Sequence, residues 1–263
     1  KLGVDARGKG FISVFDKGHA SATLAVNDAG AGNLTLANPA GALGLEASGT
    51  PQIGSARGGA ITAYNEAGEQ VAGLGTTPDG KGVLAIMEKS KVTANLLTNS
   101  SGTGLLLLSD ANGRIGLQAS GAGDSATGGG IVTIFDKEHT AAELAVNADG
   151  AGALTLNNAE GNSGMSASGA GNETSGGAVL VYNKANDMVA SLSSSADGKG
   201  LITVAEKNRE VAVLTANDVG AGNLYLNNAE GKVRLNASGQ SAAGRDGGFV
   251  TAFNGESVGV ASL

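Results

Sequence analysis

The amino-acid sequence predicts an all-β protein built from tandem β-hairpin repeats. Three observations carry this prediction: one short pattern recurs along the 263 residues, glycine exceeds twice its usual share, and short apolar runs alternate with polar residues. Glycine contributes 45 residues and proline only 3. Because glycine loses the most backbone entropy on folding, its abundance indicates repeated tight turns with positive φ.

Each repeat consists of a Gly-x-Gly element, an alternating run, a turn, a second alternating run and a closing apolar residue. The turn opens on an acidic or amide residue at Asp16, Asn38, Asn65, Glu88, Asp110, Asp136, Asn158, Asn183, Glu206, Asn228 and Asn254. The closing residue, which we call the anchor, is at Leu24, Leu45, Leu74, Leu96, Leu117, Leu144, Met165, Leu192, Leu214, Leu235 and Leu263. These eleven hairpin units predict a single repeat array over residues 1–263.

The spacing from turn opener to anchor is 8, 7 or 9 residues, which defines middle, short and long repeats. Short repeats close their turn on glycine, as in Asn38-Pro39-Ala40-Gly41. This is a hairpin signature, because the amide caps the turn and glycine supplies a left-handed residue. The flanking runs alternate with period two, as in Leu34-Thr35-Leu36, which indicates strands with one apolar face. Since an isolated hairpin is barely stable in water, we expect stacked neighbours to bury the anchors.

Charge and composition exclude several classes of partner. A net charge of −7 with only 16% charged residues disfavours nucleic acid, which needs clustered Lys and Arg. The apolar run from Leu105 to Leu108 is far shorter than the roughly 20 residues that span a bilayer, so no membrane insertion is expected. The absence of cysteine excludes disulfides and thiolate metal sites and leaves the compartment open. Because the chain begins at Lys1, we expect a mature product or a piece of a longer array.

No catalytic site is predicted, although two histidines lie close to carboxylates. His19 and His139 each stand three residues after an aspartate, a spacing that could form an acid–base pair. The corresponding position in the other middle repeats holds Lys91 and Arg209. A general base would not tolerate arginine, so we interpret this position as part of a charged turn with local ion pairing. The chain is therefore predicted not to be an enzyme.

No cofactor is predicted either. The Gly-x-Gly elements resemble nucleotide-binding loops, but those loops precede a helix and these precede a strand. Calcium is a minor alternative, because Asp79-Gly80-Lys81-Gly82, Asp149-Gly150-Ala151-Gly152 and Asp197-Gly198-Lys199-Gly200 partly match calcium-binding β-roll repeats. Those repeats need an aspartate after Gly-x-Gly-x and a nine-residue period, and this chain has neither. We therefore expect no metal site.

One stretch resembles a known class of repeat. Gly177-Ala178-Val179-Leu180-Val181-Tyr182-Asn183-Lys184, continuing to Val189-Ala190-Ser191-Leu192, is similar to repeats of Gly-rich β-hairpin proteins of the bacterial surface and phage fibre type. The likeness covers nearly the whole chain, although Asn186 stands where such repeats usually place the turn glycine. The resemblance implies an extracellular or surface role and transfers no functional residue.

The cycle of three repeat classes predicts an elongated β-solenoid or β-prism fibre. One long repeat is missing before Asp136, where Gly129-Gly130 opens like a long repeat and continues into a middle turn. In a single-chain solenoid this loss would shift every later repeat by a third of a turn. A homotrimer wound around a common axis avoids the problem, so we favour it. A single-sheet meander, a closed barrel and a propeller are the alternatives, and eleven units do not divide into blades of two.

The predicted function is that of a structural subunit of an extracellular or cell- or virion-surface fibre, with other copies of itself as its partner. The first and last anchors, Leu2 and Leu263, fit head-to-tail continuation. The alternative is an adhesin or lectin-like module that binds a ligand through the long loops after Ala-Ser-Gly, such as Gly121 to Gly128. Aromatic residues precede several turn openers, and we expect packing there more than sugar stacking: Phe15, Tyr64, Phe135, Tyr182 and Phe253.

Overall fold

The computed structural model describes residues 1–49, 58–77, 79–121, 129–147, 150–170, 176–195, 197–240, 247–256 and 258–263. The chain divides into two compact units, Lys1–Ala122 and Gly123–Leu263, which we call the N-terminal and C-terminal units. In the described ranges every regular element is a β-strand, and no helix is long and apolar enough to cross a membrane. The all-β prediction is confirmed.

The strands are short and follow one another closely. Those of the N-terminal unit are β1 (Leu2–Val4), β2 (Gly10–Asp16), β3 (His19–Val26), β4 (Gly32–Ala37), β5 (Leu43–Ser48), β6 (Ala60–Tyr64), β7 (Gln70–Thr76), β8 (Gly82–Glu88), β9 (Lys91–Thr98), β10 (Gly104–Ser109) and β11 (Ile115–Ser120). Those of the C-terminal unit are β12 (Ile131–Phe135), β13 (Thr140–Val146), β14 (Gly152–Asn157), β15 (Ser163–Ala170), β16 (Gly176–Tyr182), β17 (Met188–Ser194), β18 (Gly200–Glu206), β19 (Arg209–Ala216), β20 (Gly222–Asn227), β21 (Val233–Ser238), β22 (Phe249–Phe253) and β23 (Gly259–Ser262).

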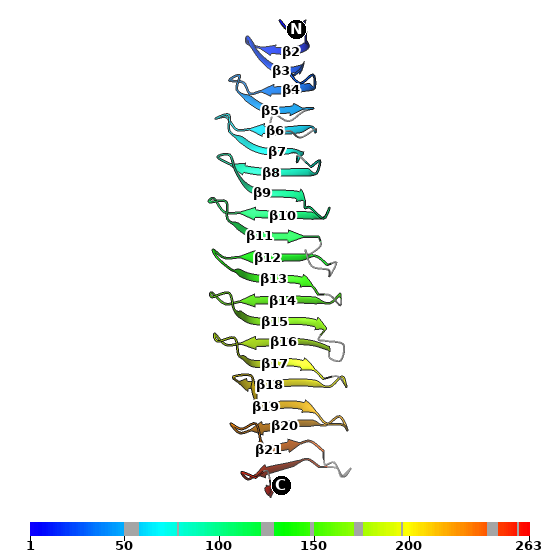
Figure 1. Ribbon diagram of the computed structural model, residues 1–263, viewed down its shortest axis with the longest axis vertical. Helices are drawn as coiled ribbons and strands as arrows, with labels where there is room; N and C mark the ends of the chain where they lie inside the picture. The colour runs from blue at the N-terminus through cyan, green and yellow to red at the C-terminus, as the bar shows by residue number, and fades with distance from the viewer. Residues whose placement is uncertain are drawn as a thin grey trace. The chain divides into compact units, whose positions relative to one another are not determined.

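Within each unit the strands form an open antiparallel meander. Each strand pairs with its neighbours in the chain, from β1 to β11 and from β12 to β23, and the strand directions alternate accordingly (Figure 1). The strands therefore form single-layer sheets by direct succession, which matches the meander alternative. The solenoid or prism form is not confirmed.

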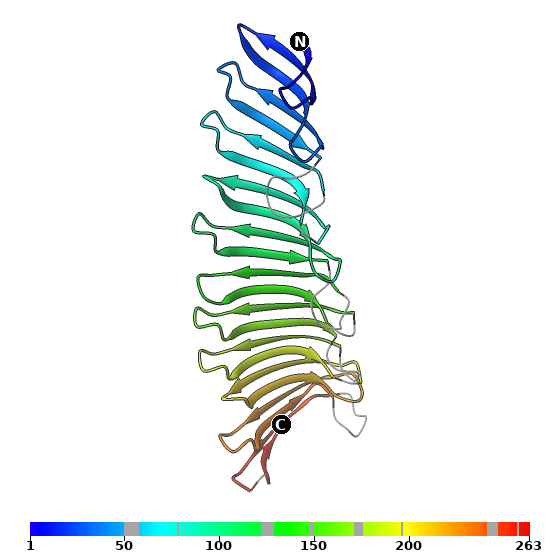
Figure 2. The ribbon, with the colours of Figure 1, turned by 45° about the horizontal axis from the view of Figure 1, so that its top comes forward.

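Two edges of each sheet carry the connections. The hairpin turns after β2, β4, β6 and their counterparts lie along one side, which we call the turn edge, and the Gly-x-Gly connections lie along the other (Figure 2). We call this second side the loop edge. A connection at the loop edge uses an Asn cap in the same way as a hairpin turn: Asn27 Oδ1 accepts the N–H groups of Ala29 and Ala31, and Gly30 has a φ of 81°.

The three spacing classes reduce to two turn geometries. In the short turn, Asn38 Oδ1 accepts the N–H groups of Ala40 and Ala42, each at 3.0 Å, and Gly41 has a φ of 81°. The long turn at Asn183 has the same hydrogen bonds, and Asn186 takes the left-handed position with a φ of 65°. Asparagine tolerates this region better than most side chains, which explains why glycine is dispensable there.

Middle turns are shorter. Lys17 and Gly18 both have positive φ, of 46° and 89°, between the paired residues Asp16 and His19, which is the pattern of a type I′ hairpin. The turn at Asp136 is a variant whose carboxylate accepts the N–H groups of Glu138 and His139, at 2.9 and 2.8 Å. Middle turns thus account for the spacing of 8. The spacings 7 and 9 share one turn and differ only in where the large apolar residue lies.

Neighbouring hairpins extend each sheet sideways and do not cover it. The buried hydrophobic residues among those described are Ala85 and Ala205, 9% and 7% exposed, and the most deeply buried side chain is a polar one, Thr203, 1% exposed. The anchor Leu144 is 56% exposed and Leu214 46%. The expectation that stacking within the chain buries the anchors is therefore wrong, because strand pairing satisfies the backbone at the strand edges and does not cover the face on which the anchors lie.

Candidate interface on the apolar face

One face of each sheet is lined by two continuous rows of aliphatic side chains, and we call it the apolar face. Because side chains alternate between the two faces of a strand, residues paired across strands and two apart along them share a face. In the N-terminal unit the first row is Leu2, Ile12, Leu24, Leu34, Ala47, Ile61, Leu74, Leu84, Leu96, Leu106 and Ala119. The second row is Val14, Ala22, Leu36, Leu45, Ala63, Ala72, Ile86, Ala94, Leu108 and Leu117.

The C-terminal unit repeats the arrangement. Its first row is Val132, Leu144, Leu154, Ala167, Val179, Leu192, Ile202, Leu214, Leu224, Ala237 and Val250. Its second row is Ile134, Ala142, Leu156, Met165, Val181, Ala190, Val204, Ala212, Leu226, Leu235, Ala252 and Ala261. Every position in these rows is aliphatic or Met, and none carries a charge. Anchors of middle and long repeats lie in the first row, and those of short repeats lie in the second.

The apolar face is open to solvent. Leu24, Leu74 and Leu192 are 52%, 52% and 54% exposed, although such side chains usually lie in a core. The accessible surface of the chain is 15667 Å², whereas a folded monomer of its 25.4 kDa typically exposes about 10,000 Å². Contiguous apolar surface beyond a few hundred Å² usually marks a site of association.

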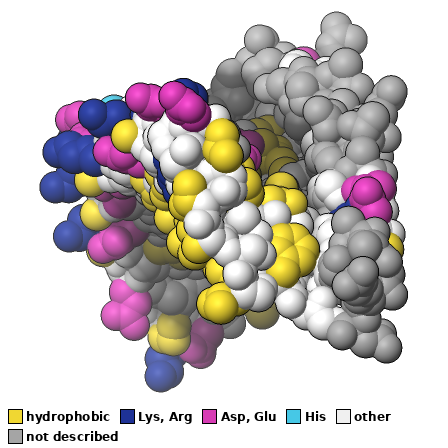
Figure 3. All heavy atoms as spheres, turned by 90° about the horizontal axis from the view of Figure 1, so that it is seen from below, with side chains coloured by type: hydrophobic (Ala, Val, Ile, Leu, Met, Phe, Trp, Pro, Cys, Tyr) yellow, Lys and Arg dark blue, Asp and Glu magenta, His cyan; other side chains and the backbone are white. Residues whose placement is uncertain are grey.

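Charged side chains are segregated from this surface. In Figure 3 most Lys, Arg, Asp and Glu side chains lie on the left of the view and a few lie on the right, with hydrophobic side chains exposed between them. The ion pairs of the turn edge include Lys184 with Glu160 and Arg209 with Glu206, at 2.6 and 3.0 Å. Their side chains are largely exposed, so each pair contributes at most about 1 kcal/mol. Further ion pairs lie at the loop edge, such as Lys81 with Asp79. The charges thus solvate both edges of the sheet, and the two aliphatic rows between them carry none.

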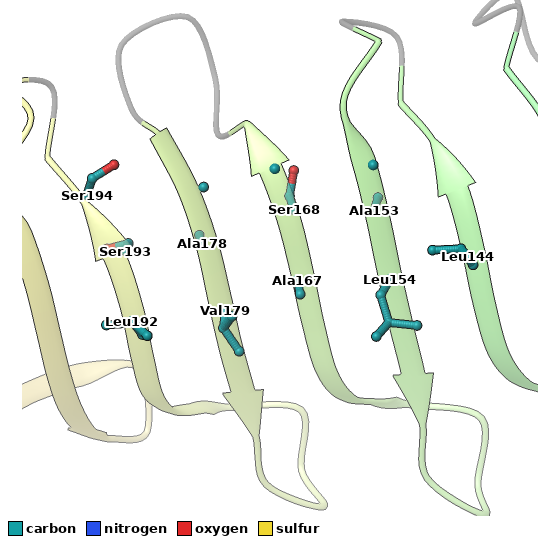
Figure 4. Close-up of a pocket in the computed structure, with 13 residues that line it drawn as sticks. Leu144, Ala153, Leu154, Ala167, Ser168, Ala178, Val179, Leu192, Ser193 and Ser194 are labelled. Atoms are coloured by element: carbon teal, nitrogen blue, oxygen red, sulfur yellow. The ribbon is translucent and has the colours of Figure 1, made fainter.

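Among the described residues of the C-terminal unit, two matching hollows interrupt the apolar face. In the first, Ala167 replaces a larger residue between Leu154 and Val179 in the first row (Figure 4). Gly152 and Gly177, each two residues before Leu154 and Val179, also line this hollow. The residues that define the second hollow are Gly222, Leu224, Ala237, Gly248 and Val250, the counterparts of the same five positions. The volumes are about 590 and 470 Å³. The hollows were not predicted from the sequence, where the recurring Ala-Ser-Gly followed by a glycine pair was their only sign.

The two histidines pack against the glycine of the next turn. A Cβ added to Gly41 would lie 3.3 Å from Nδ1 of His19, and one added to Gly161 would lie 3.1 Å from Cγ of His139. Both histidines stand at the turn edge and are exposed. The geometry therefore gives the imidazoles a packing role between hairpins. Of the charged turns expected in the middle repeats, the one from Glu206 to Arg209 contains an ion pair.

In two of the motifs compared with calcium sites, the aspartate forms an ion pair with a lysine of the same motif. Asp79 accepts a hydrogen bond from the Thr77 hydroxyl and pairs with Lys81 Nζ at 3.0 Å, and these contacts lower the pKa of the Asp79 carboxyl. Lys199 Nζ lies 2.6 Å from Asp197 and 2.6 Å from Asp218, two contacts that raise the pKa of the Lys199 ammonium. A nearby ammonium group competes with a divalent cation for these carboxylates. In the third motif the aspartate, Asp149, lies outside the described residues.

Metal ligands do not converge elsewhere in the described ranges, where no group of three or more His, Asp or Glu side chains is placed to hold an ion. The aromatic residues before the turns are mostly half-buried, with Phe15 52% exposed, and the Tyr64 hydroxyl donates to Glu46 at 3.4 Å. Of the loop proposed for an adhesin, Gly121 to Gly128, residues 122–128 lie outside the described residues, so the ligand-binding alternative stays a prediction.

Comparisons with known proteins give weak likenesses. No family model and no curated protein matches the chain. Among solved structures, the chain is similar to the Photorhabdus luminescens Tc holotoxin pore, with 9% identity and a TM-score of 0.21, covering 100% of this chain and 16% of that one. The TcdB2–TccC3 structure gives 9% identity and a TM-score of 0.20, with 100% and 17% covered. A porin-like protein from Bacteroides uniformis has 8% sequence identity and a TM-score of 0.16, and the match covers 97% of this chain and 92% of that one. The chain spans about a sixth of the toxin chains, and none of these likenesses assigns a family.

Proposed function

We propose that this protein is a non-enzymatic structural subunit of an extracellular, cell-surface or virion-surface fibre, and that its copies associate through the apolar face. The observation that carries the proposal is the pair of uncharged aliphatic rows running across each unit, with first-row anchors about half exposed. The surface in excess of a typical monomer is roughly 5,000 Å², which is the size of an obligate interface. The surface location rests on the resemblance of the repeats to those of bacterial surface and phage fibre proteins.

The assembly we favour is a homotrimer in which three chains surround a common axis with their apolar faces inward, as a β-prism. Identical repeats then meet at the same level, so any number of repeats closes, including an array from which one long repeat is missing. Gly129 supports the idea that a long repeat was lost, because it packs against Val146 as Gly58 packs against Thr76 and Gly176 against Ser194. The first glycine of a long repeat is thus kept where a middle turn follows.

The absence of catalysis is supported by the place of the histidines. His19 and His139 lie at exposed turns against Gly41 and Gly161, and the corresponding position elsewhere holds Lys91 or Arg209. A proton-transfer group needs a defined position beside a substrate, which an exposed turn does not provide.

The oligomeric state tests the proposal directly. Sedimentation velocity at micromolar concentration should show a trimer or larger species and no stable monomer, and negative-stain electron micrographs should show rods or filaments. Replacing Leu24, Leu144 and Leu214 by Glu together should shift the protein to monomer, because three charges would then lie in the first row. A monodisperse wild-type monomer would refute the proposed function.

A further inference from the structure

The two hollows of the C-terminal unit repeat at a fixed interval along the sheet. Their central alanines, Ala167 on β15 and Ala237 on β21, are six strands apart. With strands about 4.8 Å apart, the hollows are separated by roughly 29 Å. Large side chains recur at the same interval in the first row, since Leu144 on β13 and Leu214 on β19 are also six strands apart. The hollows and these large side chains on the apolar face therefore recur at the same interval of six strands.

The chemistry of the hollows matches the protrusions. The walls of the first hollow are Leu144, Leu154, Val179 and Leu192, and its polar side chains are confined to serines such as Ser168 and Ser194 (Figure 4). A small-molecule site of this volume usually presents a few convergent polar or charged groups, and none of the residues that line this hollow is charged. The hollow fits an aliphatic side chain better than a polar ligand.

We propose that each hollow receives a first-row leucine, isoleucine or valine from the strand next to the corresponding alanine in a second copy of this chain, so that assembly occurs in a defined register. This proposal rests on the proposed function and adds to it the contact that fixes the alignment. A flat apolar face would associate in many registers, because hydrophobic burial is non-directional. Depressions that match the partner's protrusions select one alignment, as interdigitation does between packed sheets.

A pair of filling substitutions separates this proposal from unspecific association. Ala167→Leu with Ala237→Leu adds apolar surface to the face and fills both hollows. Gly152→Val with Gly222→Val does the same from the glycine positions, where an added Cβ meets nothing within 4 Å and φ is not left-handed. Unspecific hydrophobic association would strengthen in both variants. If the partner's side chains occupy the hollows, the added side chains would exclude them. Each filled hollow should then raise the dissociation constant of the assembly roughly tenfold.

The matched control is Gly255→Val, which makes the same chemical change at an exposed turn with open space around it. Circular dichroism checks that every variant keeps its strands, and sedimentation equilibrium gives the dissociation constants. We expect weaker association in the two filling variants and wild-type association in the control. If the filling variants associate as well as wild type or better, the proposed register is wrong, and the proposal that the copies associate through the apolar face still holds. Binding of monomeric wild type to phosphatidylcholine vesicles in flotation would refute both proposals and identify a lipid surface as the partner.

Discussion

Two glycines in turns of the same sequence give a direct test of how hairpins pack on one another. Gly161 and Gly231 each close an Asn-Ala-Glu-Gly turn, with φ of 81° and 78°. They differ in one contact: a Cβ on Gly161 would lie 3.1 Å from the His139 ring, and a Cβ on Gly231 meets nothing within 4 Å. Replacing each glycine by alanine therefore imposes the same backbone strain and a different degree of crowding.

The magnitudes follow from these two contributions. An alanine in the left-handed region costs about 1–2 kcal/mol, so Gly231→Ala should destabilise its turn by that amount. Gly161→Ala should cost about 0.5–1.5 kcal/mol more, because the His139 side chain has to leave its preferred rotamer to clear the new methyl group. Adding His139→Ala to Gly161→Ala should remove most of the difference, because it removes the ring atoms of His139 and leaves only its Cβ, 3.3 Å from the added methyl group.

Native-state hydrogen exchange measures these losses locally. The N–H of residue 161 donates to Asn158 O at 3.0 Å and that of residue 231 donates to Asn228 O at 2.9 Å, so both amides report the opening of their own turn. Equal losses at the two turns, or a loss at Gly161→Ala that persists without the imidazole, would show that His139 does not pack on the following hairpin.

Other changes test the burial of the apolar face, the stability of two turns and the presence of a bound cation. Leu144→Ala should cost about 1 kcal/mol in thermal melts of dissociated chain, because this side chain is 56% exposed, and about 2–5 kcal/mol in the assembly; equal costs in both states would contradict burial on association. Lys137→Ala, at an exposed turn, should stay within about 0.5 kcal/mol in both states. The backbone N–H of Arg114 lowers the pKa of the Asp110 carboxyl, so this turn should keep its stability above the ordinary pKa of about 3.9 and lose it as the pH falls through the lowered value. Asp110→Asn keeps the acceptor oxygen, and amide exchange at that turn should then show no such loss. Chelation by EDTA should leave the melting temperature unchanged, and a drop would indicate a bound cation.

The local structure could be predicted closely from the sequence. Alternation in runs such as Leu34-Thr35-Leu36 correctly indicated strands with one aliphatic face, and Asn38 caps its turn as expected while Gly41 supplies the left-handed residue. These features depend on side-chain alternation and on hydrogen bonds within five residues, and both are encoded locally.

The arrangement beyond one hairpin was less predictable. The anchor spacing separated short from long repeats, but the two classes share one turn. They differ in the position of the large residue, which lies in the second row at Leu45 and in the first row at Leu74. The burial of anchors could not be predicted, because alternation identifies an apolar face but does not say what covers it. The hollows were missed for a related reason: Ala167 and Gly152 become significant only when β14 and β15 are set side by side.

Pairing between consecutive strands also bears on how the chain acquires its structure. Within each unit the partners of a strand are its immediate neighbours, so residues that meet in the ladder are separated by short stretches of chain, as with Ser48 and Ala60. Folding rates rise as such separations shrink, because little loop-closure entropy is lost before contacts form. A hairpin can therefore be added to the growing edge as soon as it emerges during synthesis. The same locality means that loss or duplication of a whole hairpin leaves the remaining ladders intact, so arrays of this kind can change length by recombination without refolding what is already built.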